Sequence, residues 1–146
     1  MKTIIQRVLS ASVTVGGVVT GEINKGYVIL LGVSPTDSPA QADSMVEKIK
    51  KLRIFPDAEG KINLSIADIK GEVLVISQFT LYADCRKGNR PSFTGAASPA
   101  HAEEIYYYFV KRCEDTFTKT ASGLFGADMK VSLINDGPFT VTLAMP

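Results

Sequence analysis

The residues best placed to carry chemistry in this chain are Ser77 and Gln78, which directly follow the apolar run Val73–Ile76. A run of this kind predicts a buried strand. Two hydrogen-bonding side chains at its end need partners, because an unpaired buried polar group costs about 1–3 kcal/mol. They either bond neighbouring backbone groups or point into a functional site, and this stretch alone does not decide between the two.

A second unusual stretch runs from Asn135 to Thr140, where Asn-Asp-Gly-Pro interrupts a predicted strand. Proline within a sheet is confined to edges, bulges and strand starts. Gly137 has no side chain, so its backbone can come close to another chain or to a ligand. The bond before Pro138 can be cis, as about 5–6% of X-Pro bonds are in folded proteins. Taken alone, the stretch is more typical of an ordinary turn.

Several familiar kinds of catalytic site are not expected. The single histidine, His101, falls in the first turn of a predicted helix and is expected to face solvent, which argues against a Ser-His-Asp triad. One histidine and the separated Cys85 and Cys113 form neither a zinc site nor a disulfide framework. There is no Walker loop and no dinucleotide-binding fingerprint. We therefore expect no metal and no cofactor.

Together, the stretches Ser77–Leu81 and Asn135–Thr140 resemble the two signatures of the D-aminoacyl-tRNA deacylase family, Ser-Gln-Phe-Thr-Leu and Asn-x-Gly-Pro-x-Thr. The resemblance runs nearly end to end, and it also includes Gln6-Arg7-Val8, Leu52–Phe55, Arg86-Lys87-Gly88, Arg90–Phe93 and Phe125–Met129. Phe139 stands where the family more often has a smaller aliphatic residue.

This resemblance implies an enzyme that hydrolyses the ester bond of D-aminoacyl-tRNA and so proofreads chirality. It implies a homodimer with active sites at the interface, aminoacylated tRNA as partner, and neither membrane nor DNA. Gly137-Pro138 would be cis and would enter the partner subunit's pocket, with its carbonyl groups against the Cα of the bound amino acid. An L-residue would collide there. Glycine, including glycine mischarged on tRNA-Ala, has no side chain to reject.

The resemblance also implies roles for residues outside the two signatures. Arg7 would hold the Gly-Pro element, and Met129 would line the pocket for the terminal adenine. From the sequence alone, Arg7 is more typical of a surface ion pair and Met129 of core packing. Arg86, Lys87 and Arg90 lie in a Gly- and Pro-rich loop. This loop is either a solvated surface segment or an arm that contacts the tRNA backbone without reading its sequence.

Hydrolysis of an activated ester does not require a strong acid or base, because oriented donors at the developing oxyanion supply a large part of the catalysis. The backbone N–H groups of Phe79 and Thr80, held in place by Ser77 and Gln78, are candidate donors. Thr80 is the less favoured nucleophile, because nothing in the sequence would deprotonate it. The 2′-hydroxyl of the terminal adenosine, or a water that it orients, is the better candidate.

Two other functions stay open beside the deacylase. One is a small-molecule esterase with a Thr or Ser nucleophile, for which Thr80→Ala would abolish turnover. The other is a non-catalytic tRNA-binding module that uses the basic loop and leaves the aminoacyl group in place.

The elements that position these residues follow from periodicity and capping. Two strands form a hairpin around Gly16-Gly17, and Tyr27–Val33 is a central strand. Helices are predicted to begin at Ser38-Pro39 and Ser98-Pro99. Further strands are predicted around Arg53–Phe55, Ile62–Leu64, Val73–Thr80, Met129–Ile134 and Phe139–Leu143. The expected fold is α+β, with a curved, barrel-like, mainly antiparallel sheet and two packed helices in a single domain, residues 1–146.

The bulk composition agrees with a globular enzyme. Hydrophobic residues make up 45% of the 146 residues, enough for a sizeable core, and the formal net charge is +1. With so little net charge, RNA binding has to come from a local patch. No apolar run approaches the roughly 20 residues that span a bilayer. With no signal peptide in evidence, we expect a soluble, cytoplasmic protein.

Overall fold

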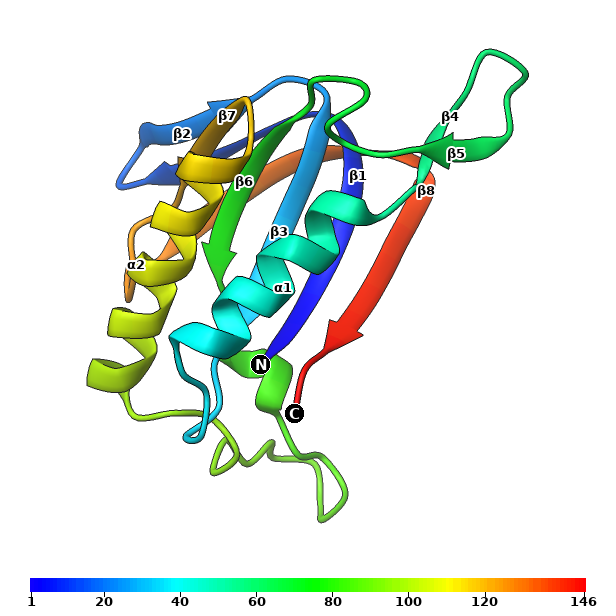
Figure 1. Cartoon of the computed structure of the whole chain (residues 1–146). Helices are drawn as coiled ribbons and strands as arrows, with labels where there is room; N and C mark the ends of the chain where they lie inside the picture. Colours follow the sequence, from blue (N-terminus) through cyan, green and yellow to red (C-terminus); the bar gives the residue numbers. More distant parts are fainter.

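The computed structural model describes residues 1–146. Figure 1 shows a strongly curved sheet with both helices on one of its faces. In chain order the elements are β1 (Lys2–Val15), β2 (Val18–Ile23), β3 (Gly26–Gly32), α1 (Pro39–Lys51), β4 (Phe55–Pro56), β5 (Ile62–Leu64), β6 (Glu72–Ser77), the 3-10 helix η1 (Phe79–Tyr82), α2 (Pro99–Thr116), β7 (Lys119–Ser122) and β8 (Met129–Ala144).

The main sheet is mixed and nearly closes on itself. Its strands follow the order β2-β1-β3-β6-β7, and β8 pairs with the free edge of β1. The β1–β2, β1–β3 and β1–β8 pairs are antiparallel, whereas β3–β6 and β6–β7 are parallel. The α+β barrel-like fold with two helices is therefore confirmed. Three of the five strand pairs are antiparallel, so the sheet is mainly antiparallel as expected. It is mixed because the two helical crossovers bring β6 and β7 in as parallel strands.

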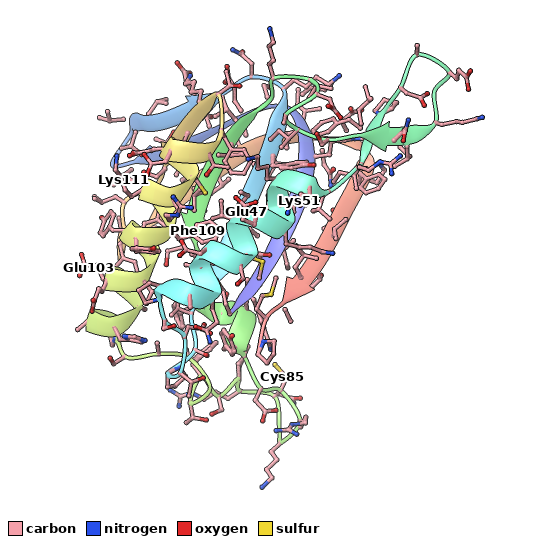
Figure 2. The ribbon with its side chains drawn as sticks, in the orientation of Figure 1. Glu47, Lys51, Cys85, Glu103, Phe109 and Lys111 are labelled. Carbon is pink, nitrogen blue, oxygen red and sulfur yellow. The ribbon has the colours of Figure 1, made fainter.

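Local sequence signals account for the predicted turns and helices. Gly16 and Gly17 form the β1–β2 turn with φ of 56° and 80°, which glycine adopts without steric cost. Helix α1 begins after Ser38, whose N–H donates to Gln41 Oε1 at 2.9 Å. Glu47 and Lys51 form an i, i+4 ion pair on the outward face of α1 (Figure 2), with Lys51 Nζ 3.8 Å from Glu47 Oε2.

The main core lies between the helices and one face of the sheet, and a second buried cluster, which includes Val28, Leu74 and Ile76, lies on the opposite face. The buried face of α1 consists of Ala42, Met45, Val46 and Ile49, and that of α2 consists of Ala102, Ile105, Tyr106, Phe109, Val110 and Cys113. The Tyr106 hydroxyl donates to the carbonyl oxygen of Val75 at 2.9 Å, which ties α2 to the central strand β6. Neither helix combines the length and apolar character needed to cross a bilayer.

One predicted strand is shorter than the sequence suggested. The strand expected over Val73–Thr80 ends at Ser77, and η1 begins at Phe79. Gly32, at the end of the neighbouring β3, explains how η1 folds over the sheet edge. A Cβ at Gly32 would lie 3.1 Å from Leu81 Cβ and 3.2 Å from the Gln78 carbonyl oxygen. Any larger residue would hold η1 away from this edge.

Candidate active site

The first signature stretch forms the end of β6 and the start of η1. The Gln78 N–H donates to the carbonyl oxygen of Leu31 at 2.8 Å, which is the last link to β3 before the chain turns. Phe79 and Thr80 are the first residues of the turn. The first N–H groups of a helical turn have no partner within that turn. Both residues are exposed.

The polar side chains of this segment form no hydrogen bonds to the backbone of the neighbouring strands. Gln78 Nε2 donates to Thr80 Oγ1 at 2.5 Å. The Ser77 side chain is half-buried and forms no hydrogen bond with another group of the chain. The interpretation that Ser77 and Gln78 bond neighbouring backbone groups is therefore wrong for both side chains.

A cavity of about 470 Å³ opens beside this segment, and eight of its thirteen lining residues are hydrophobic. It is lined by Ile76, Ser77, Gln78, Phe79, Ala97, Pro99, Ala102, Phe125, Gly126, Ala127, Asp128, Met129 and Val131. The Phe79 ring is 54% exposed and packs edge-on against Phe93, with the ring centroids 5.1 Å apart. Thr80 does not line the cavity, although its side chain bonds to Gln78, which does.

Met129 reaches this cavity because Gly123 leaves room for it. A Cβ at Gly123 would collide with the Met129 sulfur. Gly123 N–H also donates to the Val75 carbonyl at 3.0 Å, which holds the β7–β8 connection against β6. The sequence does carry a signal for this part of the site. Phe125 lies between Gly123 and Gly126, and glycines permit close packing of the backbone.

The second signature stretch is a bulge in β8. Two steps along β1, from Gln6 to Val8, lie opposite five steps along β8, from Thr140 to Asn135. Three extra residues are therefore accommodated at the predicted interruption. The Gly137-Pro138 peptide bond is cis, and both residues are exposed.

Arg7 lies beneath this bulge and is only 7% exposed. Its Nη1 donates to the Ile54 carbonyl at 2.7 Å, and its Nε donates to the Asp136 carbonyl at 3.1 Å. Nε also lies 3.5 Å from Asp136 Oδ2. A Cβ at Gly137 would come within 3.2 Å of Arg7 Nη2. The alternative of a surface ion pair is therefore wrong, because Arg7 is buried against the Gly-Pro bulge.

The two signature stretches do not meet within one chain. Strands β6, β3, β1 and β8 lie side by side in that order, and Ser77 is in register with Leu31, which pairs with Thr3. The bulge lies across from Arg7, four residues farther along β1. The separation is about 14 Å across the strands and about 13 Å along them. In Figure 1 the middle of β8 lies at the opposite end of the sheet from η1.

The basic loop follows η1, in the region that Cys85 marks in Figure 2. Arg86 is paired within the loop, with its Nη2 2.6 Å from Asp84 Oδ2. This pair holds the pKa of the Asp84 carboxyl below its usual value. Lys87 and Arg90 are exposed and form no salt bridge within the chain. The structure therefore leaves these two cations available to an external anion.

His101 and the cysteines lie outside the cavity lining. The Nε2 of His101 is 2.8 Å from the Asp37 carbonyl oxygen, and its side chain is half-buried. The expectation that His101 faces solvent is wrong, because the loop before α1 covers it. Cys113 is buried, which raises the pKa of its thiol. Cys85 is exposed.

Comparison with known proteins gives a consistent family. A family model described as D-Tyr-tRNA(Tyr) deacylase matches residues 4–144. A D-aminoacyl-tRNA deacylase from Lacticaseibacillus casei (strain BL23) is 53% identical over 141 residues, which cover 97% of this chain and 95% of the relative. Another, from Thermosipho melanesiensis, is 51% identical over 144 residues, with coverages of 98% and 96%.

Solved structures agree with this fold. One titled c-Myc DNA Unwinding Element Binding Protein has a TM-score of 0.94 and 42% sequence identity, and the match covers 100% of this chain and 99% of that chain. One titled Structural Analysis of a probable eukaryotic D-amino acid tRNA deacylase has a TM-score of 0.83 at 16% identity, which is evidence for the fold alone. The matched length, the intact signature stretches and the fold agree, and the chain belongs to the D-Tyr-tRNA(Tyr) deacylase family.

Proposed function

We propose that this protein performs the reaction of its family, hydrolysis of the ester bond of D-aminoacyl-tRNA, at the cavity beside η1. The products are a free D-amino acid and tRNA. The observation that carries the proposal is the cavity itself, which brings Ser77, Gln78 and Phe79 together with Met129. The whole chain, residues 1–146, contributes to this site as one domain.

In this proposal the cavity holds the 3′ end of the tRNA. Its mostly hydrophobic lining suits the faces of an adenine ring, because Phe79 and Phe125 offer flat aromatic rings and Met129 offers a polarisable thioether. The aminoacyl ester then lies toward η1. Its carbonyl oxygen accepts hydrogen bonds from the N–H groups of Phe79 and Thr80, which stabilise the oxyanion as the carbonyl is attacked.

The nucleophile in this proposal comes from the substrate side. Gln78 donates its amide hydrogen to Thr80 Oγ1, and an amide takes no proton at neutral pH, so it does not activate the Thr80 hydroxyl. A water that the 2′-hydroxyl of the terminal adenosine orients attacks the ester carbon. The bond between the ester carbon and the ribose oxygen then breaks, and a proton of the water passes to that ribose oxygen, which leaves a free D-amino acid and tRNA. The contact between Gln78 and Thr80 fixes the geometry of the turn that presents the two N–H donors.

We further propose that the active protein is a homodimer in which each Gly137-Pro138 bulge enters the other chain's cavity. Gly137 and Pro138 are exposed, and they are too far from Ser77 to act on the cavity of their own chain. Exposed apolar side chains lie beside the bulge, with Leu9 at 50% and Ile134 at 56% exposure. A second copy of the chain would cover them.

The bulge would then select against L-esters by collision. Its backbone carbonyls face the Cα of the bound amino acid, so the side chain of an L-residue points into them while that of a D-residue points away. Glycine has no Cβ to collide, and we propose that glycyl-tRNA, including glycine mischarged on tRNA-Ala, is also accepted. Lys87 and Arg90 contact tRNA phosphates, and Arg86 can join them if its ion pair with Asp84 opens.

The reaction is tested with matched D-tyrosyl-tRNA and L-tyrosyl-tRNA and purified protein in the presence of a metal chelator. Ser77→Tyr, whose ring would occupy the cavity, is the control variant. We expect rapid loss of the D-ester, persistence of the L-ester, and no loss of either with the control. Equal loss of both esters would contradict the selection by the bulge, and no loss of either would contradict the proposed reaction.

A further inference from the structure

Phe139 follows the Gly-Pro pair directly, and its ring lies against Arg7. The ring centroid is 4.8 Å from the guanidinium carbon, within the range of an attractive cation–π contact. The side chain is half-buried and packs against the main hydrophobic core. Phe139 therefore joins the core to the cation beneath the bulge.

The guanidinium group of Arg7 is bounded by three groups from two segments, Ile54 before β4 and the β8 bulge. The Ile54 carbonyl accepts from Nη1 at 2.7 Å, the Asp136 carbonyl accepts from Nε at 3.1 Å, and the Phe139 ring covers one face. Nη2 also lies close to Gly137, because a Cβ built there would lie 3.2 Å from it and 3.1 Å from the Phe139 backbone nitrogen. The guanidinium group of Arg7 thus packs directly against Gly137.

The backbone on either side of the Gly-Pro pair is tied down as well. Phe139 N–H donates to Asn135 Oδ1 at 2.9 Å, and Asn135 Nδ2 donates to Thr140 Oγ1 at 3.0 Å. These bonds close the bulge from within. Gly137 and Pro138 make no such bond and depend on the groups below them for their position.

We propose that Phe139 is a specificity-determining positioning residue, whose ring fixes Arg7 and thereby stiffens the Gly137-Pro138 bulge against L-aminoacyl esters. This inference rests on the proposed function. Rejection by collision requires a rigid bulge, because a bulge that moves by a few tenths of an ångström relieves most of the overlap with the L-side chain. An apolar side chain without a π face leaves one face of the guanidinium group without its contact. The bulge then yields to an L-residue, while a D-residue, which does not touch it through Cβ, reacts as before.

The test compares Phe139→Leu with Phe139→Tyr, which keeps the ring. Phe117→Leu is the matched control, because Phe117 is another partly buried phenylalanine on the same core and makes no cation contact. Single-turnover loss is measured for D-tyrosyl-tRNA, L-tyrosyl-tRNA and L-alanyl-tRNA. Thermal unfolding shows whether each variant is folded. If Phe139→Leu is not, Phe139→Met, of similar volume, is measured instead.

We expect Phe139→Leu to raise L-ester loss by about tenfold, equivalent to about 1.4 kcal/mol, while D-ester loss stays within about threefold of wild type. L-alanyl-tRNA should gain more than L-tyrosyl-tRNA, because its side chain needs a smaller displacement of the bulge. Phe139→Tyr and Phe117→Leu should keep the wild-type ratio of D to L rates. A Phe139→Leu ratio equal to that of wild type would overturn the role of Phe139 alone. A wild-type protein that spares the D-ester would instead overturn the proposed function.

Discussion

At the residue scale, the side chain of Thr80 faces an amide rather than a base. Gln78 Nε2 donates to Thr80 Oγ1 at 2.5 Å, and the only histidine, His101, has its Nε2 2.8 Å from the Asp37 carbonyl oxygen. A hydroxyl in this setting stays protonated at neutral pH. The arrangement suits a residue that shapes the turn and does not attack the ester.

We therefore predict that Thr80→Ala slows the loss of D-tyrosyl-tRNA by no more than about tenfold, because only one hydrogen bond that orients the turn is lost. Single-turnover ester loss at saturating protein is the measurement. Thr80→Ser, which retains the hydroxyl, is the control and should match wild type. Complete loss of activity in Thr80→Ala, with full activity in Thr80→Ser, would show that the hydroxyl is the nucleophile after all.

Arg7 is the residue whose loss should affect both stability and specificity. Its guanidinium group is buried and satisfies the carbonyl groups of Ile54 and Asp136. Arg7→Met keeps much of the side-chain volume but leaves both acceptors unpaired. We expect the free energy of unfolding to fall by about 2–3 kcal/mol, because buried acceptors lose charged donors. Urea denaturation measures this change. An unchanged unfolding midpoint would mean that the contacts of Arg7 with the bulge contribute little to stability.

At the element scale, η1 is the feature that turns a strand end into a site. It is placed by Gly32, which admits Leu81 and the Gln78 carbonyl at distances that leave no space for a side chain. Displacing η1 would move the Phe79 and Thr80 N–H groups relative to the cavity. Catalysis by oriented donors is sensitive to such movement, since a shift of about 1 Å costs up to about a hundredfold in rate.

Gly32→Val should consequently lower the rate of D-ester loss by about tenfold to a hundredfold, in a protein that still shows a cooperative unfolding transition. Gly60→Ala is the control. It carries the strain of a left-handed glycine position, φ 78°, in the β4–β5 hairpin, where a Cβ would meet no other atom. It should lower stability and leave the rate unchanged. Wild-type activity in Gly32→Val would show that the position of η1 is not critical.

The elements themselves were largely predictable from local signals. The Ser-Pro starts of α1 and α2 and the Gly16-Gly17 turn were found because their determinants lie within a few neighbouring residues. The parallel pairing of β6 was missed, since the β4–β5 hairpin separates α1 from β6 and hides the crossover pattern. The early end of β6 at Ser77 was missed because it depends on Gly32, a residue of another strand.

The candidate site was likewise predictable only in part: its two signature stretches were visible in the sequence, and its long-range contacts were not. The polar break at Ser77 and Gln78 and the interruption at Gly137-Pro138 are visible in the sequence because both violate the pattern of a strand. The contact between Met129 and Gly123, and the burial of Arg7 against Ile54, join residues far apart in the chain. Side-chain type and spacing carry no information about such contacts.

At the scale of the whole molecule, the proposed active site is built from two chains. The cavity and the Gly-Pro bulge lie at different ends of the same sheet, so a single chain presents each one without the other. The most direct test makes dimers from two variants. Ser77→Tyr has a blocked cavity and an intact bulge. Gly137→Ala has an intact cavity and a displaced bulge, because its Cβ would lie 3.1 Å from Phe139 N and 3.2 Å from Arg7 Nη2.

The measurement is the loss of D- and L-tyrosyl-tRNA with Gly137→Ala alone and after co-expression with an excess of Ser77→Tyr. Alone, Gly137→Ala should hydrolyse both esters, and Ser77→Tyr neither. In mixed dimers each working cavity receives an intact bulge from its partner, so L-ester loss should fall toward the wild-type level while D-ester loss persists. L-ester loss that is unchanged by the excess partner would contradict the account, because the bulge would then act within its own chain.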